Sequence, residues 1–322
     1  MTQAIRPRTP RALPAEQVQA LTRAEHLSWW TLLLIGGVSV LMYAVMGGSE
    51  AMKTALVEDL LSLLSPLCFL VAAGFHRRAP DTEYINGRAR AFDVTFLVSA
   101  VALTGVGLSI VWDSLHTLLR GQHPILGTVA VGNHLVWQGW LMIGSLVISA
   151  IPPVILGHKK QALARLLSLK TLHADADTSK ADWMTALTGV LGVIGIGLGL
   201  WWADAAAALA ISASVLKDGL RNLRSAMRDM HDARPQRVQG DQSDPLPEQV
   251  RQAVLKLAWI EQCQVRLHEE GFRISGAVFI APRSGGQVDA RMLREVHRCA
   301  LAVHWRIDEI VVTLLGEEPR AS

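Results

Sequence analysis

Residues 173–204 read HADADTSKADWMTALTGVLGVIGIGLGLWWAD, an acidic and polar approach that passes without a break into an apolar helix. Asp182 lies where the charged residues end and the apolar run begins. A carboxylate at the edge of a membrane-length helix is costly unless it has a partner or a cation, so its presence points to function. The sequence therefore predicts that another segment supplies the second half of a site around Asp182.

The composition is that of a membrane protein with a soluble appendage. Hydrophobic residues make up 50% of the 322 residues, which is more than an ordinary soluble domain carries. The net charge of +3 is small and implies no nucleic-acid partner. Three cysteines, Cys68, Cys263 and Cys299, are too widely spaced for a CxxC motif, so free thiols are expected.

Six apolar stretches are candidates to cross a bilayer, which takes roughly 20 mostly apolar residues. They lie at about residues 28–47, 54–75, 91–115, 127–156, 183–201 and 203–220. Basic residues gather on one side of this map, and they are Arg6, Arg8, Arg11, Arg23, Arg77, Arg78, Arg88, Arg90, Lys159, Lys160, Arg165, Lys170, Lys180, Arg221, Arg224 and Arg228. The opposite loops offer only Lys53 and Arg120. By the positive-inside rule both termini are expected in the cytoplasm, as an even number of spans requires.

The chain is expected to have four parts. Its expected fold class is an α-helical membrane protein with a C-terminal α+β domain. The parts are a cytoplasmic tail at 1–27, a six-helix transmembrane domain at 28–222, a linker at 223–246 and a cytoplasmic domain at 247–318. The residue pattern of the last part predicts the order helix, strand, strand, helix, strand, with Asp289 as the N-cap of the second helix. This αββαβ order favours a ferredoxin-like or metallochaperone-like domain with its helices on one face of a three-stranded sheet.

Polar side chains at membrane depth are concentrated in the second and fifth spans. Glu58 and Ser62 are four residues apart and therefore share one helix face, and Thr178 and Asp182 have the same spacing. Two helices that each offer such an oxygen pair can form a four-ligand cage. The alternative is that Glu58 hydrogen-bonds a neighbour and that Thr178 bonds the backbone of its own helix.

Two further acids lie near the ends of spans. Asp93, at the start of the third span, is expected to pair with Arg88 or Arg90. Asp204, at the short turn after the fifth span, is expected to face solvent or a water-filled vestibule.

Three stretches together resemble the cation diffusion facilitator family of divalent-metal/proton antiporters. They are GSEAMKTALVEDLLSLL at 48–64, NGRARAFD at 86–93 and ADADTSKADWMTALTGVLGVIGIGLGLWWADAAAALAIS at 174–212. The resemblance covers nearly the whole chain. It implies six spans, a cytoplasmic αββαβ domain that mediates a homodimer, and metal efflux coupled to proton antiport.

In that family the transport site consists of two (His or Asp)xxxAsp pairs, one on the second span and one on the fifth. The resemblance places the first pair on Glu58 and Ser62 and the second on Thr178 and Asp182. Only Asp182 keeps the family residue, while Glu58 keeps the charge and the other two positions carry hydroxyls. Three carboxylates near these positions are possible additional ligands, namely Asp59, Asp175 and Asp177.

A site with two carboxylates and hydroxyls is all-oxygen, which suits harder ions such as Mn²⁺, Mg²⁺ or Fe²⁺ better than zinc. The expected function is efflux of a divalent cation across the inner membrane of the cell, coupled to proton entry. The metal is the transported substrate, with Mn, Fe, Zn and Co not distinguished, and no permanent cofactor is expected. The expected partners are the lipid bilayer, the cation, protons and a second copy of the chain.

Two other functions remain open at this point. The hydroxyls at Ser62 and Thr178 are compatible with a transport-incompetent relative that acts as a partner or regulatory subunit in a membrane hetero-oligomer. A membrane enzyme with paired aspartates is the other alternative, but the sequence contains no GxGD-like or HExxH stretch. The chain is therefore not expected to be an enzyme.

Overall fold

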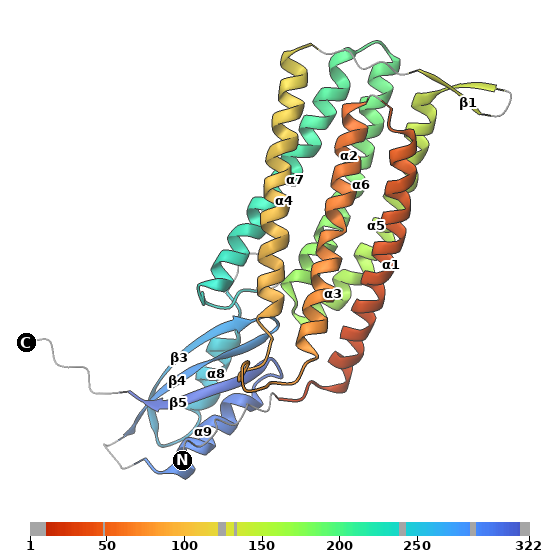
Figure 1. Cartoon of the computed structure of the whole chain (residues 1–322). Coiled ribbons are helices and arrows are strands. Elements are labelled where there is room, and N and C mark those ends of the chain that lie inside the picture. The colour runs from red at the N-terminus through yellow and green to blue at the C-terminus, as the bar shows by residue number, and fades with distance from the viewer. Residues whose placement is uncertain are drawn as a thin grey trace, which may run out of the picture.

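The computed structural model describes residues 11–47, 49–121, 127–131, 134–237, 243–283 and 288–315. Long helices form an elongated bundle, and a small sheet with its own helices lies at one end of it (Figure 1). The helices of the bundle are α1 (Ala15–Val45), α2 (Glu50–Ser62), α3 (Leu64–His76), α4 (Ala91–Leu119), α5 (Gln138–Leu167), α6 (Lys170–Gly197) and α7 (Trp201–Met230). We call the two ends of the bundle the sheet end and, opposite to it, the hairpin end, where strand β1 lies (Figure 1).

The helices have the length and composition of membrane spans. Four helical stretches among the described residues are long and apolar enough to cross a membrane, namely α1, α2 together with α3, α4, and α5. In α6 the apolar part is shorter, Asp182–Gly197. Large apolar side chains such as Leu33, Trp112 and Leu191 are exposed on the outside of the bundle, as lipid-facing surface requires. The chain is thus a multi-pass helical membrane protein.

The predicted fourth span, 127–156, is wrong at its start. Strands β1 (Thr128–Val131) and β2 (His134–Trp137) pair in an antiparallel hairpin, and α5 begins only at Gln138 and continues to Leu167. The sequence places Gly-Asn between two short apolar runs here, which is a two-residue hairpin signal. The helix is therefore displaced along the chain relative to the prediction.

The predicted second span, 54–75, is a discontinuous helix. α2 ends at Ser62 and α3 begins at Leu64. Pro66 explains the break, because proline has no N–H and its ring clashes with the carbonyl four residues earlier, which is that of Ser62. Broken helices in membrane proteins occur where the backbone is buried in protein or lines a site. The break falls on a predicted site residue.

Helix α2 lies inside the bundle, where other helices pack against it. α4 packs along α7 and α5 along α6, while α2 contacts α1, α6 and α7. The approach of α4 to α7 is close at Gly219, where a Cβ atom would lie 2.9 Å from the backbone nitrogen of Thr104. Glycine is required there for the helices to meet. The enclosed helix α2 buries Ala51, Met52 and Ala55 and carries its polar residues into the interior.

The C-terminal unit contains α8 (Leu246–Leu255), β3 (Ile260–Glu270), β4 (Arg273–Pro282), α9 (Ala290–Ala302) and β5 (Ile307–Leu314). Its strands lie in the order β3-β4-β5, with β3 and β4 antiparallel and β4 and β5 parallel. Both helices share one apolar core with the sheet, in which Val250, Val278 and Val296 are fully buried. The predicted N-cap Asp289 is confirmed, since its carboxylate accepts from the Met292 N–H at 2.8 Å.

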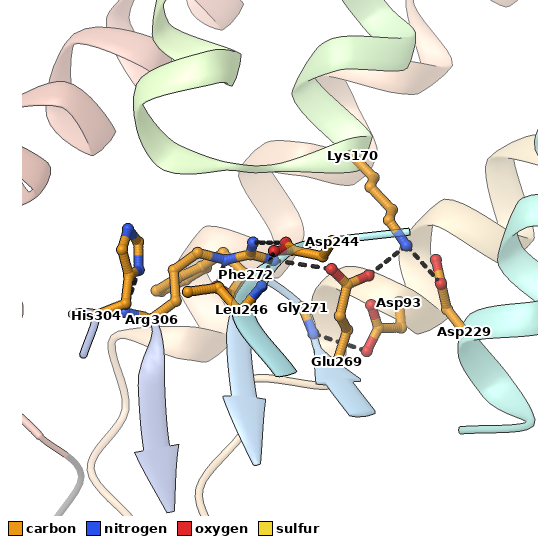
Figure 2. Close-up of polar contacts among 10 residues, drawn as sticks. All are labelled: Asp93, Lys170, Asp229, Asp244, Leu246, Glu269, Gly271, Phe272, His304 and Arg306. Carbon is orange, nitrogen blue, oxygen red and sulfur yellow. Dashed lines mark hydrogen bonds and ion pairs between the residues drawn. The ribbon is translucent and has the colours of Figure 1, made fainter. Parts of the chain in front are cut away.

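Buried ion pairs tie the sheet to the helices (Figure 2). The ammonium of Lys170, the first residue of α6, binds Asp229 of α7 at 2.7 Å and also pairs with Glu269 of β3. Burial by itself lowers the pKa of Lys170, but the two carboxylates outweigh burial and the pKa is raised. Arg306 joins Glu269 to Asp244, each at 2.8 Å. The sheet is therefore linked directly to the start of α6 and the end of α7.

The expectation that Asp93 pairs with Arg88 or Arg90 is wrong. The Asp93 carboxylate accepts from the backbone N–H of Gly271, in the turn between β3 and β4, at 2.9 Å. Arg88 binds Asp81 instead, and Arg90 binds Asp232 and Glu270. Asp93 is thus a contact between α4 and the sheet.

Candidate metal site

Helices α2 and α6 bring three of the predicted site residues together inside the bundle. Glu58, Ser62 and Asp182 are each 6% exposed. The Ser62 hydroxyl donates to Asp182 Oδ1 at 3.4 Å, and the Thr185 hydroxyl donates to Glu58 Oε1 at 3.0 Å. Ser62 contacts Asp182, whereas the earlier residue Glu58 contacts the later residue Thr185. The two helices are therefore antiparallel at this contact. The two carboxylates consequently lie about one helical turn apart across the same interface.

Two carboxylate oxygens near this contact have no hydrogen-bond donor among the described residues. Asp182 Oδ2 and Asp59 Oδ2 are buried, and no hydrogen-bond partner reaches them from the part of the chain that the structure describes. Buried polar atoms in proteins are nearly always bonded, and a buried anion without a partner is costly. A cation or a proton is the kind of partner that these oxygens require.

Thr178 and Asp177 lie in helix α6, but their side chains are outside the described residues. Thr178 as the fourth ligand and Asp177 as an additional ligand therefore stay predictions.

Asp175 has an internal cation as its partner. Its Oδ2 lies 2.6 Å from Nζ of Lys160, and the two side chains are 3% and 0% exposed. The sequence places Lys160 among the basic residues on one side of the predicted spans, whereas the structure places it inside the bundle on α5. The observed ion pair compensates the charge of Asp175 without any metal.

The expectation that Asp204 faces solvent is wrong, because this residue is 1% exposed. Its carboxylate accepts from the Ser49 hydroxyl and the Glu50 N–H, both at 2.6 Å, and from the Ala51 N–H at 3.2 Å. These groups form the N-terminus of α2, where backbone N–H groups have no helical partner and negative charge is favourable. Asp204 of α7 thereby fixes the start of the helix that carries Glu58.

Thr185 and the helix break at Ser62 were not predicted from the sequence. Pro66 is a signal for the break, since an interior proline ends or kinks a helix. No local pattern identifies Thr185, because its partner Glu58 is distant in sequence.

The described residues contain no dense cluster of strong metal ligands. Among the described residues, no group of three or more His, Cys, Asp or Glu side chains could hold a metal ion. Two carboxylates would leave the remaining coordination positions to hydroxyls, backbone carbonyls or water, as hard divalent cations accept.

A family model described as "Cation efflux transmembrane domain" matches residues 27–231. The chain therefore belongs to the cation diffusion facilitator family. It is also 23% identical over 215 residues to "Mitochondrial metal transporter 2" of Saccharomyces cerevisiae. That match covers 62% of this chain and 42% of the relative, so the chain spans less than half of that protein.

Proposed function

We propose that this protein exports a divalent metal cation from the cytoplasm in exchange for protons, through a site made by Glu58, Ser62, Thr178 and Asp182. The observation that carries the proposal is the buried pair of carboxylates on α2 and α6, with an oxygen of Asp182 that no described donor reaches. Membership of a cation efflux family and the printed name of the yeast relative support a metal as the substrate.

Protons are the counter-ions that the same chemistry favours. Two carboxylates in a buried interface are stable together only when a cation or a proton compensates their charge. Metal release on one side of the membrane therefore leaves a site that favours proton uptake. Rocking of helices between inward and outward access then exchanges one for the other.

We assign the sheet end to the cytoplasm, with α6 and α7 as the fifth and sixth spans of an inner-membrane protein. Basic side chains at that end, among them Arg77, Arg78 and Arg165, favour this orientation. Both termini are then cytoplasmic. The C-terminal unit, expected to form the homodimer, lies on the same side.

The proposal is tested by metal flux into everted vesicles that contain purified protein, with Mn²⁺, Fe²⁺, Co²⁺, Zn²⁺ and Mg²⁺ compared. Asp182→Asn removes one charged ligand and is expected to lower flux at least about tenfold, since a bond to a charged group is worth roughly 1.5–3 kcal/mol. Asp113→Asn is the matched control, because Asp113 is exposed near the hairpin end of α4. An imposed gradient that is acidic on the trans side is expected to accelerate flux.

If the Asp182→Asn variant and the parent protein show equal flux, Asp182 has no part in the mechanism. If the flux does not depend on the pH gradient, the exchange for protons is rejected. Absence of both flux and metal binding in the parent, together with co-purification of a transporter, would favour the alternative role of a regulatory subunit.

A further inference from the structure

The turn between β3 and β4 enters the sheet end of the helix bundle. Phe272, in this turn, is only 2% exposed. It belongs to an apolar cluster whose other members come from α1, α3, α4, α5 and α6, together with Leu169 just before α6. A side chain of the C-terminal unit is thus part of the buried apolar cluster at the sheet end of the bundle.

Aromatic rings surround Phe272. Its ring centroid lies 5.1 Å from that of His76 at the end of α3 and 5.7 Å from that of Phe92 at the start of α4, both in edge-to-face geometry. Trp305 of the C-terminal unit covers it at 6.4 Å. Such ring pairs add to the free energy of apolar burial and favour one orientation.

Polar contacts fix the turn at this depth (Figure 2). The Gly271 N–H donates to Asp93, and the Phe272 carbonyl accepts from Nε of Arg306 at 3.1 Å. Gly271 has φ +65, and a Cβ atom there would lie 2.6 Å from the carbonyl oxygen of Ala89. Only glycine lets the turn approach α4 so closely.

The cluster lies between the candidate metal site and the sheet end. Phe69, seven residues after Ser62, and Leu172, ten residues before Asp182, are both fully buried members of it. These separations are roughly 10 and 15 Å along the helices. In the orientation proposed above, this apolar layer lies on the cytoplasmic side of the candidate site, and Phe272 is part of it.

The turn contacts the helix that follows the site residue Ser62, and the strand before the turn contacts the start of α6. α3 follows the break at Ser62 directly, and Lys170 opens the helix that contains Asp182. Lys170 pairs with Glu269, at the end of the strand that leads into the turn. Displacement of the turn therefore acts on α3 and, through Glu269, on the start of α6.

We infer that the Gly271-Phe272 turn is the cytoplasmic gate of the transport path, closed in this structure. The inference rests on the proposed function for its direction of transport, but the closure itself does not require that metal be carried. Withdrawal of the turn opens the apolar layer, and docking of the C-terminal unit shuts it.

The gate is tested by the reaction of a thiol at the site with a membrane-impermeant methanethiosulfonate reagent. The full chain carries Ser62→Cys, with Cys68, Cys263 and Cys299 replaced by alanine, in everted vesicles that present the sheet end to the reagent. Phe272→Ala is expected to raise the labelling rate at least about tenfold, because removing a buried aromatic side chain favours the open state. Phe272→Leu keeps an apolar plug and is expected to stay near the parental rate.

Two further variants separate a gate from a general packing role. Gly271→Ala cannot dock beneath Ala89 and is expected to raise labelling as Phe272→Ala does, although the core of the sheet is unchanged. Val278→Ala weakens that core away from the turn and is expected to leave labelling unchanged.

Parental labelling rates in both turn variants, or an equal rise with Val278→Ala, would overturn the gate. That outcome leaves the transport proposal intact if Asp182→Asn still lowers flux. If the turn variants label faster but the parent shows no metal flux, the gate is retained and the transport proposal is rejected.

Discussion

Ser62 is the residue at which this site departs most clearly from its family's pattern. Its hydroxyl donates to Asp182 Oδ1, so it stabilises a carboxylate and adds no charge for a cation. The resemblance places an aspartate at this position. The site consequently has one negative charge fewer at a point in direct contact with Asp182.

Ser62→Asp is expected to tighten Mn²⁺ binding at least about tenfold, because affinity for hard cations rises with the number of carboxylates. The third buried carboxylate is also expected to lower the melting temperature of the metal-free protein, with Mn²⁺ restoring it. Equilibrium binding and thermal melting of the purified protein measure both effects.

Ser65→Asp is the control for this substitution. It introduces a carboxylate on α3, where Ser65 contacts Ser99 of α4 and not Asp182. Destabilisation without a gain in affinity is expected. Equal affinity of the Ser62→Asp variant and the parent would show that position 62 does not face the ion.

The residues of the site could be predicted only as far as local geometry reaches. The spacing of Glu58 and Ser62 gave their shared helix face, and the structure places both against α6. The partners of Asp175 and Asp204 could not be predicted, because Lys160 and the start of α2 meet them only through tertiary packing. A count of basic residues cannot tell a loop lysine from a buried one.

At the scale of elements, the Lys160–Asp175 pair joins α5 to α6 in the interior. The helices approach closely beside it, since a Cβ atom on Gly157 would lie 2.9 Å from Cβ of Ser179. Both side chains are buried, so each charge depends on the other for compensation.

Lys160→Met is expected to destabilise the protein by about 3–5 kcal/mol, because it leaves the Asp175 carboxylate buried without a counter-ion. The melting temperature in detergent measures the loss. Lys159→Met, at an exposed neighbouring position, is expected to be neutral. The double variant Lys160→Met and Asp175→Leu is expected to recover most of the stability, and a double variant as unstable as the single one would contradict this assignment.

Two elements differ from the predicted ones for identifiable reasons. The continuous span expected at 54–75 is interrupted because Pro66 removes the helical bond to Ser62. The helix expected from residue 127 begins at Gln138, since β1 and β2 pair first. Hydropathy averages over such local signals, so it located apolar segments without their internal structure.

At the scale of the whole molecule, the C-terminal unit is attached to the bundle at several places. Arg11, before α1, donates through its guanidinium to the Leu301 carbonyl at 2.7 Å, and its N–H donates to Asp308. Phe272 enters the converging helix ends, and Lys170 joins Glu269 to α7. The order of helices and strands in this unit follows the sequence pattern. Its docking does not, because the contacts combine residues from opposite ends of the chain.

The central claim, that α2 and α6 hold a divalent cation between Glu58 and Asp182, is tested most directly by equilibrium binding of Mn²⁺ to the purified protein in detergent. The parent and Asp113→Asn are expected to bind Mn²⁺ alike. Glu58→Gln and Asp182→Asn are each expected to weaken binding at least about tenfold through loss of a charged ligand. Binding of Mn²⁺ to both site variants with the affinity of the parent would contradict the account.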